Sequence, residues 1–264
     1  MDTHIDYLRL ASWEFNAYVE IMPMLMEAWP KDWIRGKWLQ YMGWRKEGIF
    51  IGRGMQGNKA HTILNISGSL AQDWYTSFLP LHGWYCTRID LQRTIETPLS
   101  SDERLALVRD DCLTPNTTLI ESEENDTLYL GSRTSDKFTR LYEKILDKKY
   151  LRLEFELKGF RSRATWDALA TGEITDKIFS FYLERSALPE RIKFEYAKPG
   201  ETATDNVMRL QMEKEEEKTL KWIESLDDSM AKNMASHAIG EQVKIIVRAW
   251  AKYADYLDKK EVAD

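Results

Sequence analysis

Side chains that could do chemistry recur at every second position in three short segments of the chain. Residues two apart on a β-strand share one face and lie about 6.5–7 Å apart. In chain order these residues are Arg88, Asp90 and Gln92, then Arg140, Tyr142 and Lys144, then Arg152, Glu154, Glu156 and Lys158. If the segments are neighbouring strands, one polar sheet face brings together a phenol, three carboxylates and several cations.

The carboxylates of Asp90, Glu154 and Glu156 could hold one divalent cation between them. Oxygen ligands without nearby His or Cys favour Mg²⁺ or Mn²⁺ over zinc. The four histidines are scattered singly and the two cysteines form no CxxC pair, which excludes the common zinc motifs. A cation at this place would polarise a phosphate oxygen and neutralise charge during an in-line displacement.

Tyr142 is the candidate nucleophile on this face. A tyrosine can attack a phosphate and form a covalent intermediate, which divides one difficult step into two reversible steps. Arg140 or Lys144, two residues away on either side, could lower the pKa of the phenol or hold the phosphate. The same alternation is also typical of a solvent-exposed sheet face with cross-strand Arg–Glu ion pairs, and spacing alone favours that simpler interpretation.

The elements that must position these side chains are strands with one charged and one apolar face. We expect strands at 85–92, 128–130, 138–145 and 151–158, with a turn at 131–136. Their reverse faces carry Leu, Ile and Phe, as in an antiparallel sheet that helices cover on one side. The sequence therefore predicts an α+β fold in which the open polar face of the sheet forms the active site.

Helical patterns occupy much of the remaining chain. We expect helices at 7–29 (interrupted at Pro23), 70–79, 102–110, 176–186, 206–226 and 243–257. This pattern divides the chain into an α+β core at residues 1–165 and a helical C-terminal region at 166–264, which we expect to pack on the core. We find no internal sequence repeat.

A GxGxxG motif spans Gly52, Gly54 and Gly57. A dinucleotide site requires the third glycine to open a helix whose N-terminus holds the pyrophosphate. Here an alternating, β-branched segment at 60–66 follows, which indicates a hairpin with 49–51. We therefore assign these glycines to a turn and predict no nucleotide site.

The charge of the chain is unevenly distributed. The 264 residues carry a net charge of −6, which argues against a general polycation that coats nucleic acid. Residues 127–166 contain ten positive and five negative side chains, a net of +5, so the rest of the chain carries −11. This block indicates either a localised contact with an anion or a solvated charged face.

The chain has no signal-peptide pattern and no apolar run long enough to span a membrane. Two cysteines, Cys86 and Cys112, cannot build a disulfide framework. We expect a reduced, cytoplasmic protein without a membrane partner.

Five pieces in fixed order carry a resemblance to a known family. They are Ile66-Ser-Gly68, Thr87-Arg-Ile-Asp-Leu91, Thr127-Leu-Tyr-Leu-Gly-Ser-Arg-Thr-Ser135, Arg140-Leu-Tyr-Glu-Lys144 and Leu151-Arg-Leu-Glu-Phe-Glu-Leu-Lys158. Together they resemble the replication initiation factor family, the nicking initiators of rolling-circle plasmids and phages with related conjugative-element relaxases. The similarity runs from about Asp6 to Trp166 and, more loosely, through the C-terminal helices.

The resemblance implies a metal-dependent, site-specific nick at a replication or transfer origin, made by residues 1–165. A tyrosine becomes linked to the 5′ phosphate and leaves a free 3′ hydroxyl. The implied nucleophile is Tyr142, with Tyr129 as the fallback, and the implied ligands of Mg²⁺ or Mn²⁺ are Asp90 and Glu154, with Glu156 as a third. Arg140 and Lys144 assist the chemistry, and the implied DNA-binding residues are Arg88, Arg133, Lys137, Arg152 and Lys158.

The implied partners are single-stranded or supercoiled origin DNA, with a host helicase and a second copy of the chain as further candidates. The chain departs from longer plasmid initiators in having only six residues, 145–150, between two of the matching pieces. The alternative is a non-catalytic DNA-binding protein on the same fold, such as a repressor or accessory replication factor. An intact set of Tyr142, Asp90 and Glu154 favours the enzyme, because a protein without the chemistry has no physical reason to keep all three.

Overall fold

The computed structural model describes residues 2–96, 105, 108–109, 116–121, 126–145, 149–198, 200–201 and 203–224. The chain divides into two compact units, Met1–Lys214 and Glu215–Asp264, and the sheet belongs to the first. The expected helix at 243–257 and Cys112 lie outside the described residues, as does most of the expected helix at 102–110. None of the described helices has the length and apolar composition that a membrane crossing requires.

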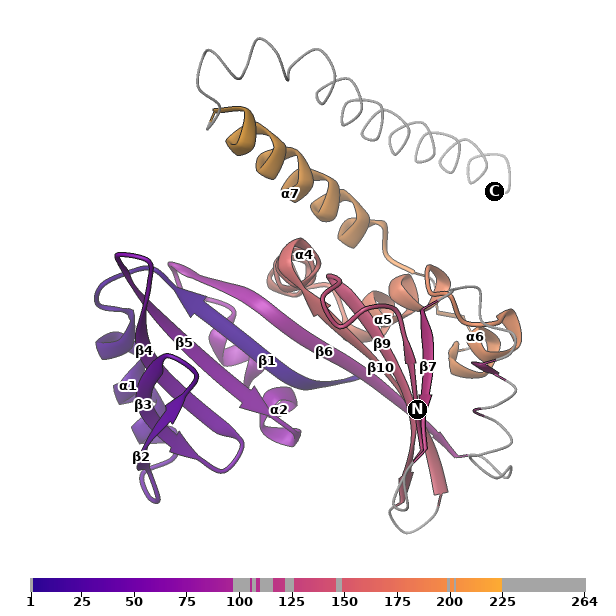
Figure 1. Cartoon of the computed structure of the whole chain (residues 1–264), viewed down its shortest axis with the longest axis horizontal. Helices are drawn as coiled ribbons and strands as arrows, with labels where there is room; N and C mark the ends of the chain where they lie inside the picture. Colours follow the sequence, from indigo (N-terminus) through magenta and orange to yellow (C-terminus); the bar gives the residue numbers. More distant parts are fainter. Residues whose placement is uncertain are drawn as a thin grey trace. The chain divides into compact units, whose positions relative to one another are not determined.

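Ten strands in the described part of the chain form one antiparallel sheet, in the order β2-β3-β4-β5-β1-β6-β10-β9-β8-β7 (Figure 1). The strands are β1 (His4–Ser12), β2 (Ile34–Trp38), β3 (Tyr41–Lys46), β4 (Ile49–Gln56), β5 (Lys59–Ser67), β6 (Trp84–Glu96), β7 (Thr117–Ile120), β8 (Thr127–Leu130), β9 (Lys137–Ile145) and β10 (Lys149–Lys158). The four strands expected to carry or flank the candidate site are confirmed as β6, β8, β9 and β10.

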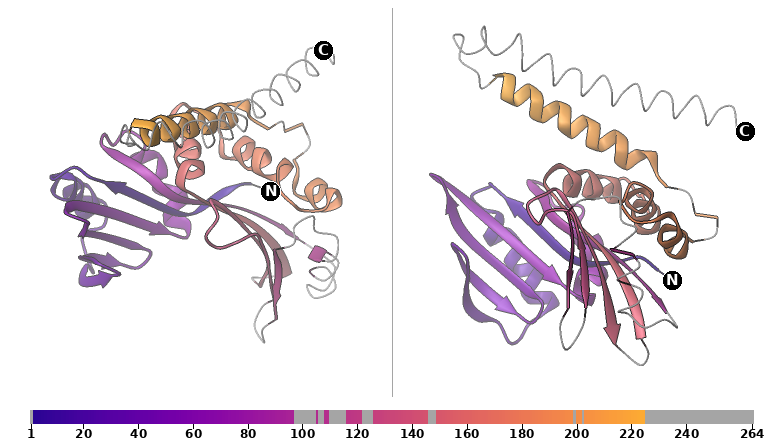
Figure 2. Two further views of the ribbon diagram at one scale, coloured as in Figure 1. Left: turned by 45° about the horizontal axis from the view of Figure 1, so that its top comes forward. Right: turned by 45° about the vertical axis from the view of Figure 1, so that its right-hand side comes forward.

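Helices cover one face of this sheet. They are α1 (Ala17–Ala28), α2 (Ser69–Phe78), α4 (Gly159–Ala170), α5 (Thr175–Glu184) and α6 (Glu190–Tyr196). The last described helix is α7 (Asp205–Glu224), whose first turns contribute Val207 and Leu210 to the core. The core lies between the helices and the apolar strand faces, where Leu8, Ile89 and Phe155 pack with Leu25 and Phe179. Figure 2 shows α4, α5 and α6 alongside the half of the sheet that contains β10. The predicted α+β fold, with its helices on one face, is confirmed.

The helix expected at 7–29 is wrong in its first part, because β1 occupies residues 4–12 and the helix begins only at Ala17. A β-bulge at Asp6 explains the misleading pattern, since the strand register shifts between Ile5 and Tyr7. The extra residue puts Ile5 and Leu8 on the same buried face although they are three residues apart, a spacing typical of a helix.

The two halves of the sheet follow the same chain path. In each half the first strand, β1 or β6, lies at the centre of the sheet, and the chain then crosses to the outer edge. It returns strand by strand, through β2–β5 or β7–β10, and ends in a helix, α2 or α4. Thus the fold contains an internal structural repeat that the sequence does not show.

Matching backbone contacts fix the correspondence between the halves. Ser67 N donates to Gly48 O at 2.8 Å in the first half, and Lys158 N donates to Asp136 O at 2.8 Å in the second. Each half then reaches a glycine with positive φ, Gly68 or Gly159, where the closing helix begins. Ser67 therefore corresponds to Lys158, and the paired strands can be aligned residue by residue from this point.

The GxGxxG glycines lie partly in a strand, which corrects the assignment of all three to a turn. Gly57, with φ of 60°, is in the β4–β5 turn, whereas Gly52 and Gly54 are inside β4. A Cβ at Gly52 would lie 2.6 Å from ring atoms of Phe50, and one at Gly54 would lie 2.9 Å from the ring of Tyr41. These two glycines therefore let aromatic rings lie against the strand.

Candidate active site

The strand register gathers the predicted polar residues on the face of the sheet that the helices leave open. The direct cross-strand neighbours are Arg88–Lys158, Asp90–Glu156, Gln92–Glu154–Arg140 and Thr94–Arg152–Tyr142. Strands β6, β10 and β9 are adjacent, so Asp90 lies directly beside Glu156, although the two are separated by more than sixty residues of sequence.

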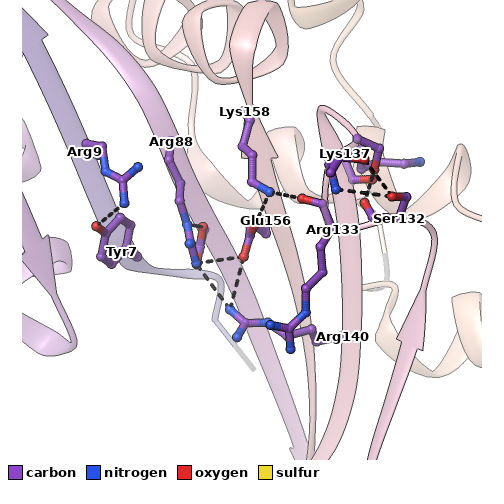
Figure 3. A network of polar contacts seen from close by, with 12 residues as sticks. Tyr7, Arg9, Arg88, Ser132, Arg133, Lys137, Arg140, Glu156 and Lys158 are labelled. Carbon is purple, nitrogen blue, oxygen red and sulfur yellow. Dashed lines mark hydrogen bonds and ion pairs between the residues drawn. The ribbon is translucent and has the colours of Figure 1, made fainter. Parts of the chain in front are cut away.

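Two guanidinium groups connect the three carboxylates. Arg88 Nε donates to Asp90 Oδ1 at 2.8 Å, and Arg88 Nη2 lies 2.8 Å from Glu156 Oε2. Arg140 Nη2 contacts Glu154 Oε1 directly and lies 3.3 Å from Asp90 Oδ2. Figure 3 shows Arg88, Arg140 and Glu156 pointing toward one another on the open face. The cross-strand ion pairs of the simpler interpretation are therefore present, but in a buried cluster.

Burial makes this cluster unusual for an ion-pair network. Asp90 and Glu154 are each only 1% exposed. Burial and the negative charge of Asp90 raise the pKa of Glu154 to about 8, and burial also raises the pKa of Asp90. The pair therefore binds a proton more readily than two solvent-exposed carboxylates would, while the charges of Arg88 and Arg140 oppose this by favouring the ionised forms.

The cluster suits a divalent cation by the type of its donors. Gln92 Oε1 is buried beside Glu154 without a hydrogen-bond partner in the described residues, and it adds a neutral oxygen to the three carboxylates. Oxygen donors of this kind are the ligands that Mg²⁺ and Mn²⁺ prefer. Within the described ranges, however, no three His, Cys, Asp or Glu side chains surround a common point as metal ligands do. Arg140 instead supplies positive charge to all three carboxylates.

Tyr142 lies against the carboxylate cluster. Its hydroxyl donates to Glu154 Oε2 at 3.2 Å, and the guanidinium of Arg152 lies 5.9 Å from its ring centroid. Burial and the charge of Glu154 raise the pKa of Tyr142 to about 12. The phenol is therefore protonated at neutral pH, and its proton points at the group that could accept it.

The fallback nucleophile, Tyr129, has different neighbours. It lies on β8 opposite Arg140, its ring stacks on Phe138 at 5.4 Å, and the guanidinium of Arg133 lies over it. Lys144 is half-buried on the Tyr142 face of β9, two residues further along the strand. Of the two tyrosines, the contact with Glu154 distinguishes Tyr142.

The predicted DNA-binding residues occupy several places. Arg88 and Arg152 are on the open face, and Arg133 is exposed in the turn before β9. Lys158 lies 2.5 Å from Glu156 and also donates to the carbonyl of Arg133. Lys137 is not brought to this face: its amino group donates to a backbone carbonyl at the end of α5, and burial lowers its pKa to about 8.

The sequence interpretation missed the contribution of β1, because it placed these residues in a helix. The guanidinium of Arg88 lies 4.5 Å from the ring centroid of Tyr7, and Arg9 Nη2 donates to the Tyr7 hydroxyl at 2.9 Å. The negative charge of Asp6, the bulge residue, adds to the effect of burial on the pKa values of Glu154 and Tyr142. The alternation of Tyr7 and Arg9 with Leu8 and Leu10 is the signal that could have identified this strand.

Comparisons with known proteins support the fold. No protein-family model matches the sequence, and no curated protein matches it. The structure is similar to the solved structure of a rolling circle replication initiator protein from Geobacillus stearothermophilus, with a TM-score of 0.54 and 15% sequence identity. The match covers 80% of this chain and 96% of that chain, so the similarity extends over nearly the whole of the other fold.

Proposed function

We propose that this protein is a replication initiator of the rolling-circle type, which nicks and rejoins origin DNA through a covalent bond between Tyr142 and a 5′ phosphate. The observation that carries the proposal is the hydrogen bond from the Tyr142 hydroxyl to Glu154 within a buried carboxylate–guanidinium cluster on an open sheet face. The fold of the Geobacillus stearothermophilus initiator supports the same class of activity.

The reaction exchanges one phosphodiester bond for another. The Tyr142 oxygen attacks the phosphorus, the bond from phosphorus to the 3′ oxygen breaks, and the phenolic proton passes to Glu154, which accepts it in its ionised form. The leaving 3′ oxygen takes up a proton and becomes a hydroxyl that can prime synthesis. Because the phosphotyrosine conserves the energy of the bond that was broken, the reverse steps rejoin the strand without an added energy source.

Asp90, Glu154 and Glu156 would hold Mg²⁺ or Mn²⁺, with Gln92 as an additional oxygen donor. When bound, such a cation would neutralise charge on the reacting phosphate and lower the pKa of a nearby phenol. Arg88 and Arg140 hold the carboxylates in place, and we assign the exposed Arg133 to the DNA backbone. Phosphate contacts of this kind fix the position of the strand and carry no sequence information.

The substrate in this proposal is origin DNA of a plasmid, phage or conjugative element, in single-stranded or supercoiled form. A second copy of the chain and a host helicase are the proposed protein partners, since a nick at an origin must be followed by strand separation.

A denaturing gel tests the proposal. Purified protein is mixed with single-stranded or supercoiled DNA that carries the origin of its own element, with Mg²⁺ or Mn²⁺ and in parallel with a chelator. We expect a shifted protein band that requires metal, that is absent in Tyr142→Phe and that persists in the matched control Tyr129→Phe.

The other outcomes are equally informative. An adduct that survives Tyr142→Phe and disappears in Tyr129→Phe would move the nucleophile to β8. Nicked DNA without an adduct would indicate a nuclease that uses water. DNA that is retarded on a native gel, with neither nick nor adduct with either metal, would refute the enzyme and support a non-catalytic DNA-binding protein such as a repressor.

A further inference from the structure

A ladder of guanidinium groups and aromatic rings leads away from the carboxylate cluster across the open face. Arg88 lies over the ring of Tyr7 at 4.5 Å, and Arg9 lies over the ring of Trp38 at 4.6 Å. Arg9 also binds the Tyr7 hydroxyl and donates from Nε to Asn65 Oδ1 at 3.0 Å, so its side chain is fixed. Figure 3 shows Tyr7 and Arg9 on the side of Arg88 that faces away from Arg140. The ladder begins at the proposed active site and ends at the edge strand β2.

The structural repeat shows how this part of the face differs from the active half. When Ser67 is aligned with Lys158, every position that carries a catalytic group in the second half carries another residue type in the first. The corresponding pairs are Arg9 with Asp90, Asn65 with Glu156, Ile63 with Glu154, Gly52 with Arg140 and Gly54 with Tyr142. The first half therefore keeps the sheet and lacks the carboxylates and the nucleophile, so it is suited to binding and not to a second nick.

Aromatic rings form a packed platform in the place of those groups, with Tyr41 and Phe50 buried and the ring of Trp38 tilted by 45° to that of Phe50. Tyr41 and Phe50 lie against Gly52 and Gly54, and Trp38 stacks on Tyr41 at 6.1 Å. The platform is held by His61, whose Nδ1 lies 2.7 Å from the Tyr41 hydroxyl. Trp38 is half-buried, so part of its ring faces solvent at the edge of the platform.

The segment that builds this platform is basic, unlike the chain as a whole. Residues 31–67 contain seven positive side chains and two negative ones, a net of +5 in a protein of net charge −6. The positive residues are Lys31, Arg35, Lys37, Arg45, Lys46, Arg53 and Lys59, and the negative ones are Asp32 and Glu47. By the strand register, Arg45 and Lys59 share the open face with the rings, whereas Arg35, Lys37, Lys46 and Arg53 lie on the other face. On the open face, the cations are complementary to phosphate and the rings to planar bases.

We propose that the ladder of Arg88, Tyr7, Arg9 and Trp38 is a track for the single-stranded DNA next to the scissile phosphate. This inference rests on the proposed function, because that function places a phosphodiester at Tyr142. Bases stack on the rings and on the guanidinium planes, and Arg9 contacts a phosphate. A single strand is the occupant because only unpaired bases expose their faces to aromatic side chains, whereas a duplex offers its edges and backbone.

Fluorescence anisotropy with a labelled single-stranded oligonucleotide of mixed sequence tests the track. All variants are made in a Tyr142→Phe background, so that cleavage does not contribute to the signal. We expect Trp38→Leu to weaken binding about tenfold and Trp38→Phe, which keeps an aromatic face, to restore most of the affinity. Phe194→Leu is the matched control, since Phe194 is 83% exposed on α6, and it should bind like its parent.

The salt dependence separates base stacking from phosphate contact. Arg9→Gln should reduce the slope of log Kd against log salt by about 0.7, as expected for one lost phosphate contact with a single strand, whereas Trp38→Leu should leave the slope unchanged. Arg209→Gln on α7 is the matched control for the loss of an arginine, because Arg209 is exposed and paired with Glu213. Thermal melting of each variant verifies that it is folded.

The failures of the two proposals are distinguishable. If the protein with Tyr142 intact forms the covalent adduct but folded Trp38→Leu and Arg9→Gln variants bind like their parent, the track is refuted and the enzyme stands. If both variants lose binding but the protein with Tyr142 intact forms no adduct, the track is supported and the proposed nicking activity is refuted. The track would also be refuted if the protein bound a hairpin duplex more tightly than the single strand and neither variant changed this preference.

Discussion

Asp176 provides a quantitative test of how the helices hold the strand that carries the candidate site. Its carboxylate, at the start of α5, accepts hydrogen bonds from Thr3 N at 2.9 Å, Arg93 Nη2 at 3.1 Å and Lys198 Nζ at 2.5 Å. Arg93 is fully buried and lies on β6, the strand of Asp90, with its side chain among the helices. Replacing Asp176 by Asn keeps the shape of the side chain and removes its charge.

The magnitude follows from the pKa of this group. Burial alone would raise the pKa of Asp176, but the hydrogen bonds from Lys198 and Thr3 outweigh it and lower the pKa from 3.8 to about 2. One pKa unit corresponds to about 1.4 kcal/mol, so the undiscounted contribution to stability is about 2.5 kcal/mol. The side chain is 25% exposed, and solvent screening reduces the expected contribution to about 1–2 kcal/mol.

The sign of the pH dependence is fixed by the direction of the shift. A carboxyl whose pKa is lower in the folded state contributes its full stability above its unfolded pKa, and this contribution is lost as the pH falls through the folded value. The difference in unfolding free energy between parent and Asp176→Asn should therefore be about 1–2 kcal/mol at neutral pH. It should shrink between pH 4 and pH 2, where Asp176 becomes protonated.

Urea denaturation followed by circular dichroism measures this difference at each pH. Glu184→Gln is the matched control, because its carboxylate is 55% exposed and pairs with a neighbouring arginine, so it should change stability by less than about 0.5 kcal/mol. A difference for Asp176→Asn that is independent of pH, or no larger than that of the control, would show that the pKa of Asp176 is not lowered.

Two further predictions concern the two halves of the sheet. Mg²⁺ or Mn²⁺ should raise the melting temperature of the parent protein, by an amount that corresponds to about 2.7 kcal/mol when the free metal concentration is one hundred times its Kd. A chelator should reverse this effect, and the melting temperature of Glu154→Gln should not change when metal is added. Gly52→Ala should lower the free energy of unfolding by about 1–3 kcal/mol in urea, because the added Cβ would meet the ring of Phe50 at 2.6 Å, whereas Gly57→Asn, in the open turn, should change it little.

The second half of the sheet could be predicted from the sequence because each strand carries apolar side chains on one face and polar side chains on the other. In β10, the residues Leu151, Leu153 and Phe155 alternate with Arg152 and Glu154, so periodicity two is visible and the polar face follows from it. The register could not be predicted in the same way. Which carboxylate lies opposite which guanidinium depends on strand pairing over long sequence separations, and no local pattern contains that information.

The first half was predicted less well, for reasons that lie in particular residues. The bulge at Asp6 gave β1 a helical spacing, and the segment that forms β2 and β3 has large side chains on both faces. Trp38 and Tyr41 lie on the open face of these strands, while Met42 and Trp44 line a cavity on the other. Strand β3 lacks an alternation between apolar and polar residues, and β2 alternates over five residues only, so this segment resembles a tryptophan-rich connection.

The structural repeat is invisible in the sequence because the two halves share only the requirements of the fold. Both need an apolar face against the helices and a glycine of positive φ before the closing helix, and many sequences satisfy these conditions. The open faces of the two halves share no such requirement. The second half therefore carries Tyr142 and Glu154 where the first half carries Gly54 and Ile63.

The position of β6 would connect the proposed nicking site in the second half of the sheet with the proposed DNA-binding ladder in the first. Arg88 is on the strand where the halves meet, and it contacts Asp90 and Glu156 in one half and the ring of Tyr7 in the other. Any change in charge at the carboxylates therefore acts on a guanidinium that is also the first step of the aromatic ladder. A DNA strand bound along the ladder would be coupled to the proposed active site through the Arg88 side chain. Arg88→Lys keeps the positive charge and removes the planar stacking group, so it is the most direct test of that coupling.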